Sequence, residues 1–143
     1  SRYTQAGLLR IWSSSPFLDF LHLPYRNNQR RSSHYAFVNF TSPAAAREFR
    51  WKVDGSILPD APSTRLSVRI AKVQGLEANM QLHCWEDGRH LPAVFKDGVR
   101  IHFEDYFGEV MRRSAWEKAH IGTMKTDFFS QPADLGLGGS MSI

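Results

Sequence analysis

The alternation of side chains in residues 33–40, SHYAFVNF, restricts the fold of this chain more than any other feature. Successive side chains of a β-strand point to opposite faces of a sheet, so Ala36, Val38 and Phe40 share one face. We expect that face to cover a hydrophobic core. The opposite face carries Ser33, Tyr35, Phe37 and Asn39. Two aromatic rings on that face must either bind something or lie beneath another part of the chain.

Two segments carry the signals of short helices. In residues 3–12, YTQAGLLRIW, Thr4 is the expected N-cap. In residues 41–55, TSPAAAREFRWKVDG, Ser42 is the expected N-cap, a proline follows it, and Gly55 comes after the last turn. The side chains expected on the buried helical faces are Leu8, Ile11 and Trp12 in the first segment and Ala46, Phe49 and Val53 in the second.

Two further segments are predicted strands. Residues 17–25, FLDFLHLPY, are apolar on both faces, which suits a strand in the middle of a packed layer. Residues 65–73, RLSVRIAKV, alternate and place a basic side chain on the outer face. The order helix, strand, strand, helix, strand predicts an α+β fold, with two helices on one face of an antiparallel sheet.

The chain after Gly75 has less regular signals. Residues 76–85 predict a short helix, and LPAVF and VRIHF flank KDG as a hairpin whose turn is expected to exceed two residues. Residues 103–120 predict an amphipathic helix that either packs on its own domain or docks onto a partner. Its apolar stripe comprises Phe103, Phe107, Val110, Met111 and Ser114. The Gly-rich tail, LGLGGSMSI, has too few apolar residues to fold alone.

The net charge of +4 is unevenly distributed. Up to Gly75 the chain has 11 Lys/Arg and 4 Asp/Glu, whereas the remainder has 7 and 10. A polyanionic partner is therefore expected to contact the first half.

The single cysteine excludes an intrachain disulfide. No apolar run approaches the ~18–20 residues of a membrane span.

Catalytic and metal chemistry receive little support from the sequence. Cys84 follows His83, but adjacent residues on a helix diverge by about 100° and do not form a nucleophile–base pair. The six histidines show no ligand spacing with a second cysteine or a carboxylate cluster. We therefore expect no enzyme activity, no catalytic or metal-binding residue and no cofactor, and we expect Cys84 to be a core or half-buried thiol.

Residues 33–40 resemble the octamer of the RNA recognition motif, K/R-G-F/Y-G/A-F/Y-V/I/L-x-F/Y. Six of the eight positions match, whereas Ser33 replaces the basic residue and His34 the glycine. With the flanking DFLHLP, NFTSP and RIAKVQG, residues 2–85 are similar to the C-terminal RNA recognition motif of Mei-two-like proteins of fungi, plants and protists. The resemblance implies a ferredoxin-like domain over residues 1–85. Residues 86–143 are then a C-terminal extension of hairpin, helix and tail.

One element of that family is missing. The motif normally begins with a strand that lies centrally in the sheet beside the octamer strand, and this sequence starts within the first helix. Unpaired backbone groups at that position would be costly. Either upstream residues, a later segment such as LPAVF or VRIHF, or a partner chain must pair there.

The resemblance implies that Tyr35 and Phe37 stack single-stranded RNA bases, each stacked base contributing ~1–3 kcal/mol. Cationic side chains around the sheet would contact phosphates, and Asn39 and Ser67 could hydrogen-bond base edges. The expected cations are Arg30 and Arg31 in the loop between the strands and Arg69 and Lys72 on or near the last strand.

The alternative is a repurposed motif that acts as a structural or accessory subunit. In that interpretation the C-terminal extension covers the aromatic pair or contacts a protein partner. The family implies a nuclear or cytoplasmic location, and an organellar one stays open because the native protein can have residues upstream of Ser1.

Overall fold

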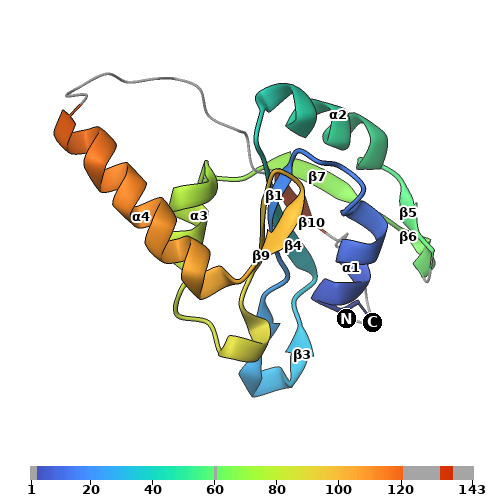
Figure 1. Cartoon of the computed structure of the whole chain (residues 1–143). Helices are drawn as coiled ribbons and strands as arrows, with labels where there is room; N and C mark the ends of the chain where they lie inside the picture. Colours follow the sequence, from blue (N-terminus) through green and yellow to red (C-terminus); the bar gives the residue numbers. More distant parts are fainter. Residues whose placement is uncertain (1–2, 60, 121–132, 137–143) are drawn as a thin grey trace.

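The computed structural model describes residues 3–59, 61–120 and 133–136, with side chains for residues 3–59 and 61–113. The helices are α1 (Gln5–Trp12), α2 (Pro43–Val53), α3 (Leu76–His83) and α4 (Phe103–His120), with short 3-10 helices at Asn27–Gln29 and Gly88–His90 (Figure 1). The strands are β1 (Leu18–His22), β2 (Tyr25–Arg26), β3 (Arg31–Ser32), β4 (Tyr35–Phe40), β5 (Ile57–Leu58), β6 (Ala61–Arg65), β7 (Ser67–Ile70), β8 (Ala93–Lys96), β9 (Val99–Ile101) and β10 (Ala133–Gly136).

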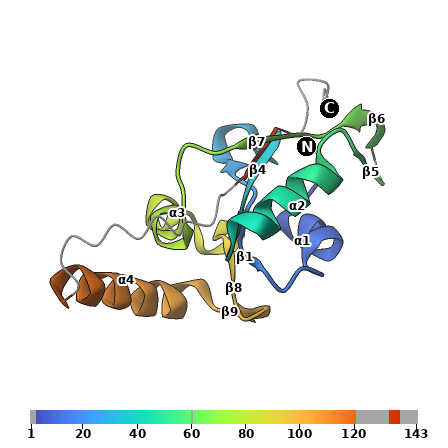
Figure 2. The ribbon, with the colours of Figure 1, turned by 90° about the horizontal axis from the view of Figure 1, so that it is seen from above.

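The main sheet is antiparallel and has the strand order β7-β10-β4-β1-β8-β9. Two small sheets, β2-β3 and β5-β6, lie outside it. Helices α1 and α2 lie on one side of the main sheet, and α3 and α4 lie on the other, as the view from above shows (Figure 2). The protein is therefore a mixed α+β structure with helices on both faces of an antiparallel sheet. The predicted boundary at residue 85 stays a prediction.

The helix caps predicted from sequence are confirmed. The Thr4 side chain accepts a hydrogen bond from the Gly7 amide at 3.0 Å, and that of Ser42 accepts one from the Ala45 amide at 3.2 Å. These bonds satisfy amides that have no partner within a helix. Gly55 follows α2 with a φ of 77°, the left-handed conformation that glycine adopts without strain.

The first hydrophobic core lies between the sheet and helices α1 and α2. As predicted, the side chains of Ala36, Val38 and Phe40 are buried in it. For α1 the prediction is partly wrong, because Leu9 is buried with Leu8 and Trp12 while Ile11 is 39% exposed. Strand β1 is buried along its whole length, as its apolar sequence predicts.

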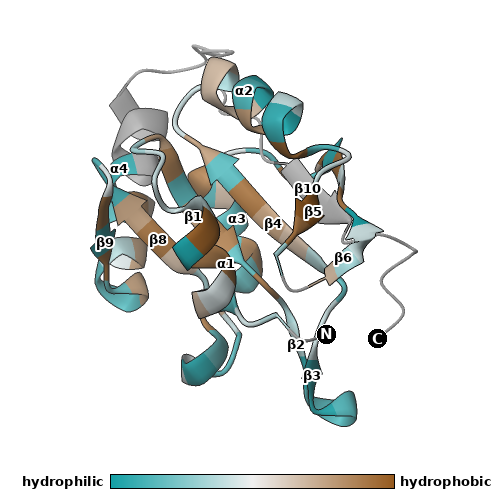
Figure 3. Cartoon of the chain, turned by 90° about the vertical axis from the view of Figure 1, so that its right-hand side faces the viewer, coloured by the Kyte–Doolittle hydropathy of each residue, from teal (hydrophilic) through white to brown (hydrophobic). Residues whose placement is uncertain are grey.

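The second hydrophobic core lies on the other face, beneath α3 and α4. Its buried members are Phe20, Met80, Val94, Phe103, Tyr106 and Val110. Strand β8 has hydrophobic colours along most of its length because residues of both cores alternate on it (Figure 3). Of the two interpretations of the amphipathic helix, packing on its own chain is therefore observed for residues 103–113. The side chain of Ser114 lies outside the described residues.

The hairpin in the second half differs from its prediction in two ways. Lys96 pairs with Val99, so the turn consists only of Asp97 and Gly98 rather than a longer loop. Both residues have positive φ, 52° and 79°, as a type I′ turn requires. Moreover, β8 pairs with β1. It therefore does not fill the position of the missing strand beside β4, for which LPAVF was one of the predicted candidates.

Strand β10 occupies that open position. It pairs with β4 on one side, where Leu135 lies opposite Ala36, and with β7 on the other, where Leu135 lies opposite Val68. The predicted tail begins at Leu135 and was expected not to fold alone. Its first two residues belong to β10, a central strand of the sheet. Residues 137–143, the rest of the predicted Gly-rich tail, lie outside the described part of the chain.

Candidate nucleic-acid interface and histidine cluster

The sheet face opposite α1 and α2 carries the aromatic residues singled out from sequence. We call it the aromatic face; its residues include Phe20, His22, Tyr35, Phe37, Ser67 and Arg69. Cross-strand partners share a face of a sheet, and His22 pairs with Phe37. The pairs of Asp134 with Phe37 and Arg69, and of Gly136 with Tyr35 and Ser67, put Ser67 and Arg69 on this same face.

Tyr35 and Phe37 form an aromatic pair that is half-buried. Their ring centroids are 5.5 Å apart and the rings are nearly perpendicular, at 77°. Phe37 also contacts the imidazole of His83 from α3, at a centroid distance of 5.6 Å. Helix α3 therefore covers part of Phe37. Glycine at position 136 adds no side chain at the site beside Tyr35.

Asn39 is not accessible to a base edge, contrary to the prediction. It is fully buried, and its Nδ2 donates a hydrogen bond to Oδ1 of Asp19 at 2.8 Å. Burial raises the pKa of Asp19 to about 7, and the hydrogen bond from Asn39 opposes that rise. The side chain of Asn39 thus forms a buried hydrogen bond within the protein and does not face a ligand.

Two of the predicted contact residues, Ser67 and Arg69, lie on the aromatic face, and Lys72 follows their strand. Ser67 and Arg69 on β7, and Lys72 just after it, are exposed. One strand, β10, separates β7 from β4, so the Arg69 and Phe37 backbones are roughly 10 Å apart. A single-stranded chain that crosses Tyr35 could therefore reach these groups.

Arg30 and Arg31 lie in the β2-β3 hairpin, which continues beyond the ends of β1 and β4. Arg30 is exposed and has a φ of 49°, and Arg31 is half-buried, with its Nε donating to Gln29 at 2.9 Å. In the same hairpin, Tyr25 stacks on His90 with ring centroids 4.0 Å apart. The two arginines are thus grouped apart from Arg69 and Lys72.

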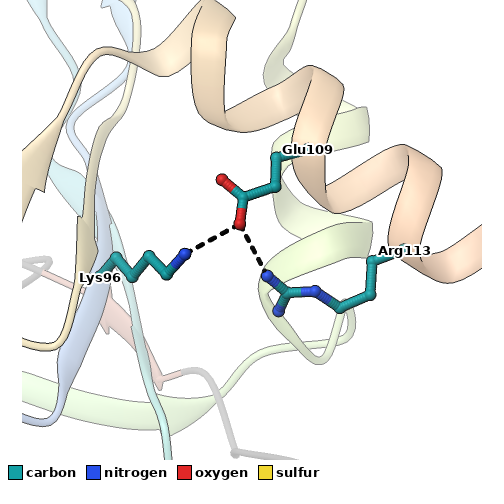
Figure 4. A network of polar contacts seen from close by, with 3 residues as sticks. All are labelled: Lys96, Glu109 and Arg113. Atoms are coloured by element: carbon teal, nitrogen blue, oxygen red, sulfur yellow. Dashed lines mark hydrogen bonds and ion pairs between the residues drawn. The ribbon is translucent and has the colours of Figure 1, made fainter.

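Helix α4 is tied to the sheet by a charged network as well as by apolar contacts. Oε1 of Glu109 accepts hydrogen bonds from Lys96 Nζ at 2.9 Å and from Arg113 Nη2 at 3.0 Å (Figure 4). The hydrogen bond with Lys96 lowers the pKa of Glu109 and raises that of Lys96. Because these groups are largely exposed, the network orients α4 more than it stabilises the fold.

A histidine cluster that the sequence did not predict is assembled by the fold. His22 on β1 is fully buried, its ring lies 4.4 Å from that of His83, and its Nε2 lies 3.4 Å from Oε1 of Glu86. Burial, aided by His83 and His90, lowers the pKa of His22 to about 3, and burial also lowers that of His83. The one sequence signal was the three-residue spacing of His83 and Glu86, since His22 is far away in the chain.

Cys84, adjacent to this cluster, is a half-buried thiol, as predicted. Its Sγ donates to the carbonyl oxygen of Gln81 at 3.1 Å.

Comparison with known proteins does not assign the chain. No model of a protein family matches it, and no curated protein is recognisably related to it. Within the described residues, no helix combines the length and apolar composition needed to cross a bilayer.

Proposed function

We propose that this protein is a single-stranded RNA-binding module related to the RNA recognition motif, and that it binds through the open part of the aromatic face. The observation that carries the proposal is the half-exposed Tyr35, which lies across from a glycine position and on the same face as Ser67 and Arg69. A flat aromatic ring beside cations is the arrangement by which many proteins bind single strands.

The strand order supports the relationship to this motif. The family expectation was a central strand beside the octamer strand, and β10 lies between β4 and β7 and is antiparallel to both. Two helices, α1 and α2, cover one face of this part of the sheet. The family's first strand, which is absent from this sequence, normally occupies the position between these two strands. Here β10 fills that position.

The coverage of Phe37 determines what kind of binding is expected. Tyr35 and Phe37 are both half-buried, but His83 contacts Phe37, so we assign the main stacking role to Tyr35. One stacked base contributes ~1–3 kcal/mol, and phosphate contacts from Arg69 and Lys72 add a salt-sensitive term. We therefore expect weak binding with little sequence preference.

The test is fluorescence anisotropy with labelled single-stranded RNA pools at low and moderate salt. Tyr35→Ala should weaken binding by about 5-fold to 150-fold, the range that corresponds to one stacked base at ~1–3 kcal/mol. Trp51→Ala is the matched control, because Trp51 is an 83% exposed aromatic residue on α2, which covers the opposite face. Equal losses in both variants, or no binding by the folded wild type, would contradict the proposal.

A second candidate is an accessory protein-interaction module. It is favoured by the outward side of α3 and its C-terminal end, where Leu82 is 54% and Trp85 90% exposed. Exposed large apolar groups that are close together often mark contacts with other proteins. A folded wild type that shows no salt-sensitive RNA binding would favour this candidate.

A further inference from the structure

Within the described part of the chain, the buried imidazole of His22 has no hydrogen-bond partner. Its side chain is fully buried, and neither Nδ1 nor Nε2 makes a hydrogen bond with any described residue; the same is true of Nε2 of His83. A buried polar atom without a partner typically costs about 1–3 kcal/mol, so such atoms are rare unless a ligand or ion satisfies them. Two adjacent imidazoles whose buried nitrogens lack hydrogen-bond partners point to a ligand that both rings share.

The third group at this position is a carboxylate. One ligand atom from each of His22, His83 and Glu86 lies within 4.8 Å of the others. Ligand atoms about 2.0–2.1 Å from a tetrahedral zinc ion are roughly 3.3–3.4 Å from one another. The distance of 3.4 Å from Nε2 of His22 to Oε1 of Glu86 meets this requirement. Small side-chain movements of His83 would close the remaining distance.

We infer that His22, His83 and Glu86 form a binding site for a divalent transition metal ion, with Zn²⁺ as the best match. Two imidazoles and one carboxylate favour zinc over calcium and magnesium, which prefer oxygen ligands only. Three protein ligands leave a fourth position for water. The side chain of Glu86 is 32% exposed, which provides the access that this fourth ligand requires.

The ion would join two elements that are far apart in sequence. His22 belongs to β1, in the middle of the sheet, and His83 and Glu86 lie at the end of α3 and just after it. Coordination therefore attaches the end of α3 to the aromatic face. Since His83 also contacts Phe37, the ion would hold the cover of Phe37 in place, and this consequence does not depend on RNA binding.

The alternative is a purely structural cluster, in which the two imidazoles pack on each other and on Phe20 and Phe37. The ring contacts of His83 with these residues, at 6.0 Å and 5.6 Å, are compatible with that role. Packing leaves the ring nitrogens unsatisfied, however, whereas coordination satisfies one nitrogen of each ring.

The experiment is a titration of the full chain, first treated with a chelator and then dialysed, with ZnCl₂ in a calorimeter. A parallel titration with Co²⁺ follows the visible absorption bands of four-coordinate cobalt. The expected wild-type result is one tight site, with cobalt bands that Zn²⁺ abolishes.

The decisive variants are His83→Gln and Glu86→Gln, because both side chains are at least partly exposed and circular dichroism can confirm that the variants fold. Each should lower Zn²⁺ affinity on the order of 100-fold or more, since removing even a group that only orients a ligand costs roughly 10-fold to 100-fold. The matched control is His102→Gln, which removes an exposed histidine near Asp105 and should leave the affinity unchanged. The inference is overturned if the wild type has no site of this kind, or if both decisive variants bind Zn²⁺ as tightly as the control.

Discussion

Asp19 shows how tertiary burial changes the chemistry of a single residue. It lies in β1, where the register against β4 shifts between Leu18 and Phe20, and it is 6% exposed. Its carboxylate accepts a hydrogen bond from the side-chain amide of Asn39. Because burial disfavours the charged form, Asp19 stays protonated in the folded protein up to a pH of about 7.

Asp19→Asn should therefore remove a pH dependence of stability. In the unfolded chain Asp19 ionises near its ordinary pKa of 3.8, so between that value and about 7 the folded state binds more protons. The contribution of Asp19 to wild-type stability then falls as pH rises through this window, by up to about 4 kcal/mol at about 1.4 kcal/mol per pH unit. The Asp19→Asn variant keeps the shape of the side chain and lacks this contribution, while the other titrating groups affect both proteins alike.

Urea denaturation of both proteins at about pH 4.5 and about pH 7.5 measures the effect. The stability of the variant relative to wild type should increase with pH and then become constant above about 7. A constant difference across the window would show that Asp19 is ionised in the folded protein at low pH.

At the scale of elements, the short strand β10 joins two parts of the sheet, because it pairs with β4 on one side and β7 on the other. Its four residues complete the backbone pairing of both β4 and β7. A proline within a central strand removes an amide from the ladder and is not tolerated there.

Leu135→Pro should destabilise the fold by at least roughly 2 kcal/mol more than Leu135→Ala, because only proline removes the backbone donor. Urea denaturation gives the two free energies of unfolding. Hydrogen exchange should in addition show faster exchange of the amides of β4 and β7 that face β10. Equal stability and protection in the two variants would mean that β10 is not a required member of the sheet.

Helix α3 offers a second comparison at this scale, because two of its apolar residues differ in burial. Met80 is fully buried in the second core, whereas Leu82 is 54% exposed. Met80→Ala should cost about 2–5 kcal/mol of unfolding free energy, the usual cost of truncating a buried side chain.

Leu82→Ala, on the same helix, should change stability by less than about 0.5 kcal/mol. Thermal or urea denaturation separates the two results. Similar small effects in both variants would show that α3 contributes little to the stability of the second core.

At the scale of the whole molecule, the charge asymmetry and the fold act together. The basic excess belongs to the residues up to Gly75, which supply β7 with its exposed Arg69 and, just after the strand, the exposed Lys72. The elements that cover the aromatic face, α3 and α4, come from the less basic second half. Strand β10, between β4 and β7, also comes from the second half, so the charge asymmetry distinguishes β7 from α3 and α4 but does not extend over the whole open part of the face.

Under the proposed function, Arg69→Gln and Lys72→Gln should each reduce the salt dependence of RNA binding. The slope of log K against log salt should become shallower by about 0.7 for each phosphate of a single strand that is no longer neutralised. Arg10→Gln, which changes an exposed residue of α1 on the opposite side of the sheet, is a control and should leave the slope unchanged. Identical slopes for all three variants would exclude phosphate contacts by Arg69 and Lys72.

The sequence alone determined those features that depend on residues close together in the chain. The alternation in residues 33–40 predicted β4 and its core face, and Thr4 and Ser42 predicted the starts of two helices. These signals are reliable because side-chain period and helix capping are local. The outer face was less predictable: Tyr35 remains half-exposed, whereas Asn39 on the same strand is fully buried.

Only the tertiary structure decided what lies beside and above that strand. The position of β10 between β4 and β7, the cover of Phe37 by His83, and the meeting of His22 with Glu86 all join residues distant in sequence. Backbone pairing in a sheet is nearly independent of side-chain identity, so four residues such as ADLG carry no local signal of their partners. The partners are selected by the free energy of burying apolar side chains in the two cores, and that free energy depends on residues from the whole chain.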